Sequence, residues 1–225
     1  MHLILILVAM LLAAPAQAQT PPTEAERNGY GGLHAAAVRG DVAEIRRLIA
    51  AGANPNARDG AQRTPVHVAA YFSRIEAMQA LVAGGGDINA LEHRKYDVVT
   101  IASVKDDEAT LKAALALNAN ARAITSPYDG TALIAAAHLG HDGVVRQLIR
   151  AGAPLDHVNN LGWTALIEAV ILGDGGRRHQ ETVRALVEAG ARLDLADREG
   201  RTPLQHARSR GYADIARIIE SKSAR

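Results

Sequence analysis

The chain has 225 residues, a formal net charge of +1, 48% hydrophobic residues, 3% aromatic residues and no cysteine. This composition is that of an ordered domain or a regular repeat array and excludes the disordered class. The balanced charge gives no electrostatic sign of nucleic-acid binding. The absence of cysteine excludes disulfides, thiolate metal sites, a cysteine nucleophile and lipid attachment through an N-terminal cysteine.

The first 18 residues differ from the rest. An apolar run over residues 3–14 is followed by Pro15 and by Ala16-Gln17-Ala18, and small residues at 16 and 18 match the cleavage pattern of a secretory signal peptide. The run is too short to span a bilayer, which needs about 20 residues. We predict a cleaved signal peptide over residues 1–18 and no membrane insertion afterwards. The missing basic residues before the run leave an uncleaved anchor as the alternative.

From residue 31 onward the chain repeats one pattern six times. Each copy begins at a residue that can cap a helix N-terminus, and these residues are spaced by 33, 33, 34, 33 and 38 positions: Gly31, Thr64, Asp97, Thr131, Thr164 and Thr202. Five positions later the residue is always alanine: Ala36, Ala69, Ala102, Ala136, Ala169 and Ala207. A position restricted to alanine indicates that two helices approach closely there.

A second amphipathic helix follows the first in each copy, as in DVAEIRRLIAAG, with apolar residues at helical spacing. These helices end at Gly52, Gly85, Asn118, Gly152 and Gly190. Such an end needs a positive φ, which glycine adopts freely and asparagine tolerates better than most residues. We therefore expect Asn118 to take the same left-handed conformation as the glycines.

The segments RTPVHVAAYFSRIEAMQALVAGGGDINA and GRTPLQHARSRGYADIARIIE resemble ankyrin repeats, with a Thr-Pro helix start, paired helices and a glycine-containing exit. The resemblance covers about residues 29–221 and implies an all-α solenoid with short β-hairpin or loop fingers. Six repeats are expected near 31–63, 64–96, 97–130, 131–163, 164–201 and 202–221. A polar tether over 19–28 would precede them and a tail over 222–225 would follow. The resemblance implies no particular function.

Two copies depart from the pattern. The third copy, DVVTIASVKDDEATLKAALALN, lacks the Thr-Pro start, the glycine between its helices and the closing glycine. Because neighbouring repeats supply the burial that one repeat lacks, we expect this copy to be the least stable link. The fifth copy carries five extra residues within Gly173–Gln180. We expect a flexible loop there, with a second contact surface as the alternative.

No sequence motif indicates a reaction. Nucleophile elbows, Walker loops and HExxH motifs are absent. His34 and His67 occupy the position where the ankyrin family uses histidine to brace neighbouring turns. His138 and His141 are three apart, but they are expected on either side of a turn, without a third ligand. We therefore predict no enzyme activity, no catalytic or metal site and no cofactor. A metal-binding or enzymatic protein is the minor alternative.

The aromatic residues indicate a binding face instead. Six of the seven aromatic residues map to the fingers or to the ends of the first helices, where the ankyrin family varies its groove-facing residues. Aromatic and arginine side chains are the usual anchors of protein interfaces, although an aromatic residue before a cap can also pack over the next hairpin. The candidate partner-binding residues are Tyr30, Arg63, Tyr71, Phe72, Tyr96, Tyr128, His138, Leu139, Trp163, Ile171, Leu172 and Arg201.

These expectations combine into one functional hypothesis. The chain is predicted to be an exported, monomeric scaffold that binds another protein through its concave groove and binds no nucleic acid. In a Gram-negative bacterium the signal peptide would place it in the periplasm, and the partner would be a periplasmic or envelope protein. A secreted effector directed at a host is the alternative.

Overall fold

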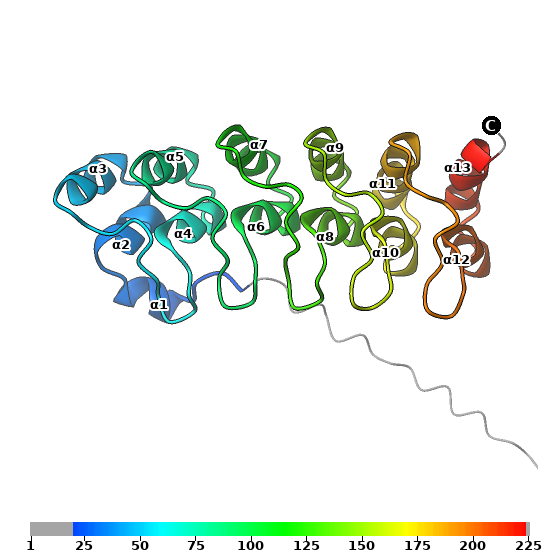
Figure 1. Ribbon diagram of the computed structural model, residues 1–225, viewed down its shortest axis with the longest axis horizontal. Helices are drawn as coiled ribbons and strands as arrows, with labels where there is room; N and C mark the ends of the chain where they lie inside the picture. The colour runs from blue at the N-terminus through cyan, green and yellow to red at the C-terminus, as the bar shows by residue number, and fades with distance from the viewer. Residues whose placement is uncertain (1–19, 224–225) are drawn as a thin grey trace, which may run out of the picture.

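The computed structural model describes residues 20–223 and shows paired helices stacked side by side in an elongated array (Figure 1). One helix of each pair lies in an inner layer and the other in an outer layer, and loops project beyond the inner layer. After α1 (Glu24–Gly29), the inner helices are α2 (Gly32–Arg39), α4 (Pro65–Tyr71), α6 (Val98–Val104), α8 (Ala132–His138), α10 (Ala165–Ile171) and α12 (Pro203–Ser209). The outer helices are α3 (Val42–Ala50), α5 (Ile75–Ala83), α7 (Glu108–Ala116), α9 (Asp142–Arg150), α11 (Arg177–Glu188) and α13 (Ala213–Ser223). This arrangement confirms the predicted all-α solenoid. In the part of the chain described, no helix has the length and apolar character needed to cross a membrane.

Each inner helix begins directly after its predicted cap residue. The Asp97 carboxylate, for example, accepts the Thr100 backbone N–H at 2.7 Å, and Pro65 and Pro203 occupy the first turn of their helices. An N-cap acceptor satisfies one of the backbone N–H groups that a helix start leaves without a partner. All six predicted starts are therefore confirmed.

The six repeated alanines are completely buried, each with 0% exposure. Each inner helix also contacts the inner helix of the next repeat. Protein interiors are packed without spare volume, so a longer side chain would push neighbouring inner helices apart. The restriction to alanine thus follows from the close stacking of the inner layer.

The outer helices end as predicted, including the one that ends without glycine. Asn118 has φ 64°, in the same left-handed region as Gly85 at 94° and Gly152 at 79°. Between the two helices of the third repeat, Asp106 has φ 56°, where the fourth repeat has Gly140 at 67°. The third repeat therefore keeps the backbone path of its neighbours with residues that tolerate it less easily than glycine.

The projecting loops, called fingers below, span residues 58–63, 91–96, 124–130, 158–163 and 196–201. Each finger folds around one polar side chain that accepts the backbone N–H groups two and four residues later; Asp59 does so at 2.9 and 2.8 Å. The equivalent residues are Glu92, Ser126, Asn159 and Asp197. Within residues 20–223 no extended strand forms, and one isolated bridge joins Thr125 to Gly130. The fingers are thus tight loops, one of the two forms expected.

The predicted polar tether is wrong for residues 20–28, because most of this segment folds as α1. The Thr23 hydroxyl accepts the Glu26 N–H at 3.2 Å, and the Glu26 carboxylate accepts the Thr23 N–H at 2.7 Å. This reciprocal capping box starts the helix. Glu26 also forms an ion pair with Arg63 in the first finger, so α1 is attached to the end of the array.

The five-residue insertion is also not the loose loop that was expected. It lengthens α11 to 12 residues, against 9 in α9. Arg178 Nη2 donates to Asp106 Oδ2 in the third repeat at 2.7 Å, and His179 Nε2 lies 3.0 Å from the His138 carbonyl oxygen in the fourth. A Cβ atom on Gly140 would lie 2.9 Å from the His179 ring, so glycine permits this close approach. The insertion bridges the third, fourth and fifth repeats.

Candidate functional site

The large apolar side chains left exposed on the described residues gather in the middle of the array. Five lie on the second, third and fourth fingers and one lies at the end of α8: Leu91, Ile124, Tyr128, Val158, Leu161 and Leu139. Their exposed fractions lie between 38% and 56%. Exposed apolar side chains that cluster in one region usually mark an interaction site. This cluster is the candidate binding surface.

A polar cluster joins the fourth finger to the inner helices α8 and α10. Glu168 on α10 is 5% exposed; its Oε1 accepts the Asn159 side-chain amide at 2.7 Å, and its Oε2 lies 3.5 Å from His138 Nδ1. A buried carboxylate needs such hydrogen-bonding partners to offset its lost hydration. The cluster therefore fixes the fourth finger relative to α8 and α10, so that its exposed side chains are held in place.

The twelve candidate residues fall into three groups by exposure. Exposed residues are Tyr128, Leu139 and Arg201, and half-buried residues are Tyr30, Phe72, His138, Trp163, Ile171 and Leu172. Arg63, Tyr71 and Tyr96 are buried, at 2%, 6% and 7% exposure. The prediction that these last three contact a partner is wrong, because their side chains are already enclosed by the fold.

Arg63 is buried because it closes the N-terminal end of the array. Its Nε donates to Asp59 Oδ2 at 2.7 Å, and the Tyr30 hydroxyl donates to the same oxygen at 2.5 Å. Burial works to raise the pKa of Asp59, but the hydrogen bonds from Tyr30 and Arg63 outweigh it and hold this pKa below its usual value. Arg63, Asp59, Tyr30 and Glu26 thus form a structural network rather than a docking surface.

Tyr71 and Tyr96 belong to the continuous hydrophobic core of the stacked helices. Burial raises the pKa of both phenols. Sequence position alone did not separate these two residues from Tyr128, because all three lie at finger or helix-end positions. Their burial depends on the side chains of neighbouring repeats, which vary.

Four residues of the candidate surface were missed by reasoning from the sequence: Leu91, Ile124, Val158 and Leu161. That reasoning weighted aromatic residues and overlooked aliphatic ones. A usable signal was present, since Leu91, Ile124 and Val158 occupy the same place in three successive fingers. Apolar residues at one loop position of adjacent repeats are unusual where water is the only neighbour.

The histidines have the structural roles expected for them. The Thr64 N–H donates to His67 Nδ1 at 3.1 Å, so Nε2 carries the proton and donates to the Tyr96 carbonyl oxygen at 3.3 Å. Burial lowers the pKa of His67 to about 4, which keeps the ring neutral. His138 ends α8 and His141 caps α9, so they lie on either side of the turn. Among the described residues, no three histidine, aspartate or glutamate side chains are grouped so as to hold a metal ion.

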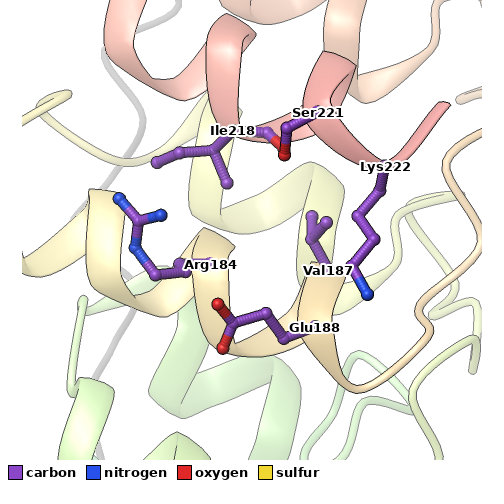
Figure 2. A pocket seen from close by; sticks show the side chains of 6 residues that line it. All are labelled: Arg184, Val187, Glu188, Ile218, Ser221 and Lys222. Atoms are coloured by element: carbon purple, nitrogen blue, oxygen red, sulfur yellow. The ribbon is translucent and has the colours of Figure 1, made fainter. Parts of the chain in front are cut away.

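Two hollows lie in the outer layer, away from the candidate surface. One, of about 300 Å³, is lined by the α11 residues Arg184, Val187 and Glu188 and by the α13 residues Ile218, Ser221 and Lys222 (Figure 2). The Ser221 hydroxyl donates to the Ile218 carbonyl oxygen at 2.8 Å, so it is engaged in the helix's own hydrogen bonding. The other hollow, of about 660 Å³, lies between α3 and α5. Neither hollow contains a predicted site residue.

Comparison with known proteins identifies the architecture. Family models of ankyrin repeats match residues 33–82 (many copies) and 99–197 (three copies). The chain is 32% identical over 190 residues to the putative ankyrin repeat protein YahD of Escherichia coli strain K12, covering 84% of this chain and 94% of that protein. The chain belongs to the ankyrin repeat family.

Two solved ankyrin structures share most of this fold. An ankyrin repeat domain from Acinetobacter baumannii AYE is 40% identical, with a TM-score of 0.80 and coverage of 85% of this chain and 97% of that one. The ankyrin repeat protein EF0377 is 31% identical, with a TM-score of 0.76 and coverage of 84% and 96%. The ankyrin repeat domain is a general protein–protein interaction module, so the exposed apolar surface lies on a fold used for binding proteins.

Proposed function

We propose that this ankyrin repeat protein is a non-enzymatic scaffold that binds another protein through the face formed by its inner helices and fingers, the concave groove of the family. The observation that carries the proposal is the gathering of exposed apolar side chains on three adjacent fingers and at Leu139. The fully buried core of a protein interface is more apolar than its rim, and tyrosine is among the residues that most often contribute strongly to binding. Tyr128 and Leu139 are the strongest anchors among the predicted residues, because both are more than 40% exposed.

The stacking of the repeats supports this function energetically. The fingers are fixed by their own polar side chains and by the Glu168 cluster, so few loop conformations would be lost on binding. Ordering flexible loops and side chains subtracts from affinity, and a surface held in place before binding avoids part of that cost. The module would therefore act by rigid presentation of its surface.

The place of action proposed is the periplasm, with secretion as the alternative. Its support is the apolar run and small-residue pattern of residues 1–18, which lie outside the residues that the structure describes. Cell fractionation combined with N-terminal sequencing tests it. A periplasmic protein that begins at Gln19 supports export with cleavage. An intact N-terminus in the membrane fraction would contradict it, and protein in the culture medium would favour a secreted effector.

Crosslinking in the native cells, followed by identification of the attached protein, tests the function itself. The matched variants are Tyr128→Ser with Leu139→Ser on the proposed face and Lys112→Ser on the outer helix α7, where the side chain is also exposed. We expect one main crosslinked partner whose yield falls several-fold in the first variant and is unchanged in the second. Equal yields from all three proteins, with unchanged thermal unfolding, would contradict binding through this face.

A further inference from the structure

Residues of the fingers, most of them exposed, form two rows that run along the array. The first row consists of the first residue of each finger: Arg58, Leu91, Ile124, Val158 and Ala196. The second row consists of the residue at the tip of each finger: Ala61, Arg94, Tyr128, Leu161 and Glu199. The tip row is in register, because each tip N–H donates to the polar side chain of its own finger. The middle of the two rows is mostly apolar. At the ends, the first row has Arg58 and Ala196 and the second has Ala61 and Glu199, and Arg198 and Arg201 lie beside Glu199 on the last finger.

Backbone hydrogen bonds join the first four fingers into one surface. The N–H groups of His93, Ser126 and Asn160 donate to the carbonyl oxygens of Ala61, Lys95 and Tyr128 in the preceding fingers, at 2.9 to 3.1 Å. The rows therefore lie on a continuous ribbon, called the finger ribbon below. An extended ligand could cross several fingers without bridging a gap.

The charge at the ends of the finger ribbon is predominantly positive. The exposed residues Arg58, Arg198 and Arg201 form no ion pair with any carboxylate of residues 20–223. Of the carboxylates on these two fingers, only that of Glu199 is exposed, whereas those of Asp59 and Asp197 are 7% and 2% exposed and already face Arg63 and His206. A ligand with negative charge at its ends would be attracted to this arrangement.

The spacing of the fingers favours one backbone conformation of the ligand. Packed helices lie about 8–10 Å apart, so equivalent finger residues recur at about that distance. A polyproline II segment rises about 3.1 Å per residue and returns to the same face every third residue, at about 9.3 Å. A β-strand returns to the same face every second residue, at about 6.7 Å, and would not match successive fingers.

We propose that the finger ribbon binds an extended protein segment with an apolar residue at every third position and acidic residues at both ends. Leu91, Ile124 and Val158 would each contact one of the apolar residues, and Arg58 and Arg201 would attract the acidic ends. This inference rests on the proposed function and specifies the chemistry of the partner. It places the main contacts on the fingers rather than on the inner helices.

Fluorescence anisotropy with synthetic peptides tests the proposal on the full mature chain. The probe is EEVPQLPQVPQEE, and its controls are KKVPQLPQVPQKK, the period-two peptide EEVPLPVPQQQEE, and a helical peptide with the same apolar residues seven positions apart. We expect the probe to bind about tenfold more tightly than any control, which corresponds to about 1.4 kcal/mol. Equal or weaker binding of the probe would overturn the proposal. Binding to anionic phospholipid vesicles with none to the probe would also overturn it, in favour of a membrane surface.

Substitutions locate the binding on the protein. Ile124→Ser with Val158→Ser should weaken probe binding about tenfold, and Arg201→Glu should weaken it less and in a salt-dependent way. Leu139→Ser measures any contribution of the inner helices, and Lys112→Glu on the outer helix α7 is the control that should leave binding unchanged. Circular dichroism melting shows whether each variant is folded. If Leu139→Ser abolishes binding and the Ile124 and Val158 variant does not, the finger proposal fails while binding through the inner helices survives.

Discussion

The third and fifth repeats both depart from the regular pattern, but in opposite ways. The third repeat has lost features: Asp106 replaces the glycine between its helices, and Ala114 stands where the outer helices of the fourth and fifth repeats have Leu148 and Leu186. The fifth repeat has gained five residues. The two departures meet in space, because Arg178 of the insertion donates to Asp106 at 2.7 Å. The insertion in one repeat thus contacts the repeat that is expected to be the least stable, two repeats away.

The third repeat also depends on side chains of its other neighbour. Lys105 Nζ donates to the Tyr71 carbonyl oxygen at 2.6 Å and to Ser73 Oγ at 2.9 Å, and the Ser73 hydroxyl donates to Asp107 at 2.5 Å. Burial lowers the pKa of Lys105, although the Asp107 carboxylate partly offsets this. The third repeat is therefore held by hydrogen bonds to the repeats on both sides.

The largest expected effect comes from removing one buried leucine from each of the two regions. Leu111 on α7 and Leu186 on α11 are both 0% exposed, so Leu111→Ala and Leu186→Ala should each lower the free energy of unfolding by about 2–5 kcal/mol. In a one-dimensional array a weak link can uncouple its two sides. Urea denaturation should therefore show two transitions for Leu111→Ala and one for Leu186→Ala. A single transition in both would show that the third repeat is not the weak link.

Acid should weaken the contact between α4 and the second finger, which leads into the third repeat, more than it weakens the fifth repeat. His67 joins α4 to the second finger, and its pKa is lowered by burial from 6.5 to about 4, whereas Ile167 occupies the equivalent place in the fifth repeat. Between these pH values the unfolded chain binds a proton that the folded chain does not. The free energy of unfolding should thus fall by about 3 kcal/mol as the pH drops from 6.5 to 4.

The pH dependence of denaturation, measured on the wild-type chain and on His67→Gln, separates this contribution. His67→Gln should flatten the curve over that range, although it also lowers stability at neutral pH. A wild-type curve that is level from pH 6.5 to 4 would contradict the buried neutral imidazole.

The smallest expected effect concerns the ion pair between the insertion in the fifth repeat and the third repeat. Arg178 and Asp106 are partly exposed, with side-chain exposures of 55% and 32%, and pairs of this kind contribute about 0.2–1 kcal/mol. A double-mutant cycle with Arg178→Ala and Asp106→Asn should give a coupling energy of about 0.5 kcal/mol that decreases at high salt. Arg177→Ala is the control next to it and should show no coupling. Zero coupling at low salt would mean that the insertion does not support the third repeat.

Much of the architecture followed from local chemistry. The six helix starts, the six buried alanines and the left-handed Asn118 could be predicted, because each depends on one residue type at one backbone position. The tether and the insertion could not be placed, because α1 and Arg178 are fixed by partners 37 and 72 residues away in the chain. Such pairs leave no periodic signal in a single sequence.

The exposure of the candidate binding residues could be predicted only in part, for a related reason. Tyr128 and Leu139 are exposed as expected, but Tyr71 and Tyr96 are buried by neighbouring repeats. Whether a finger residue faces solvent depends on the side chains packed around it, and these differ from repeat to repeat. The aliphatic residues Leu91, Ile124 and Val158 indicate an exposed surface more reliably, because they share one position in adjacent fingers.

The most direct test of where this protein binds is amide hydrogen exchange, measured on the free chain and on the complex with its crosslinked partner. We expect slower exchange in residues 91–96, 124–130 and 158–163 of the complex, with α11 and α13 unchanged. Slower exchange confined to the outer hollow between α11 and α13, with the fingers unaffected, would contradict it.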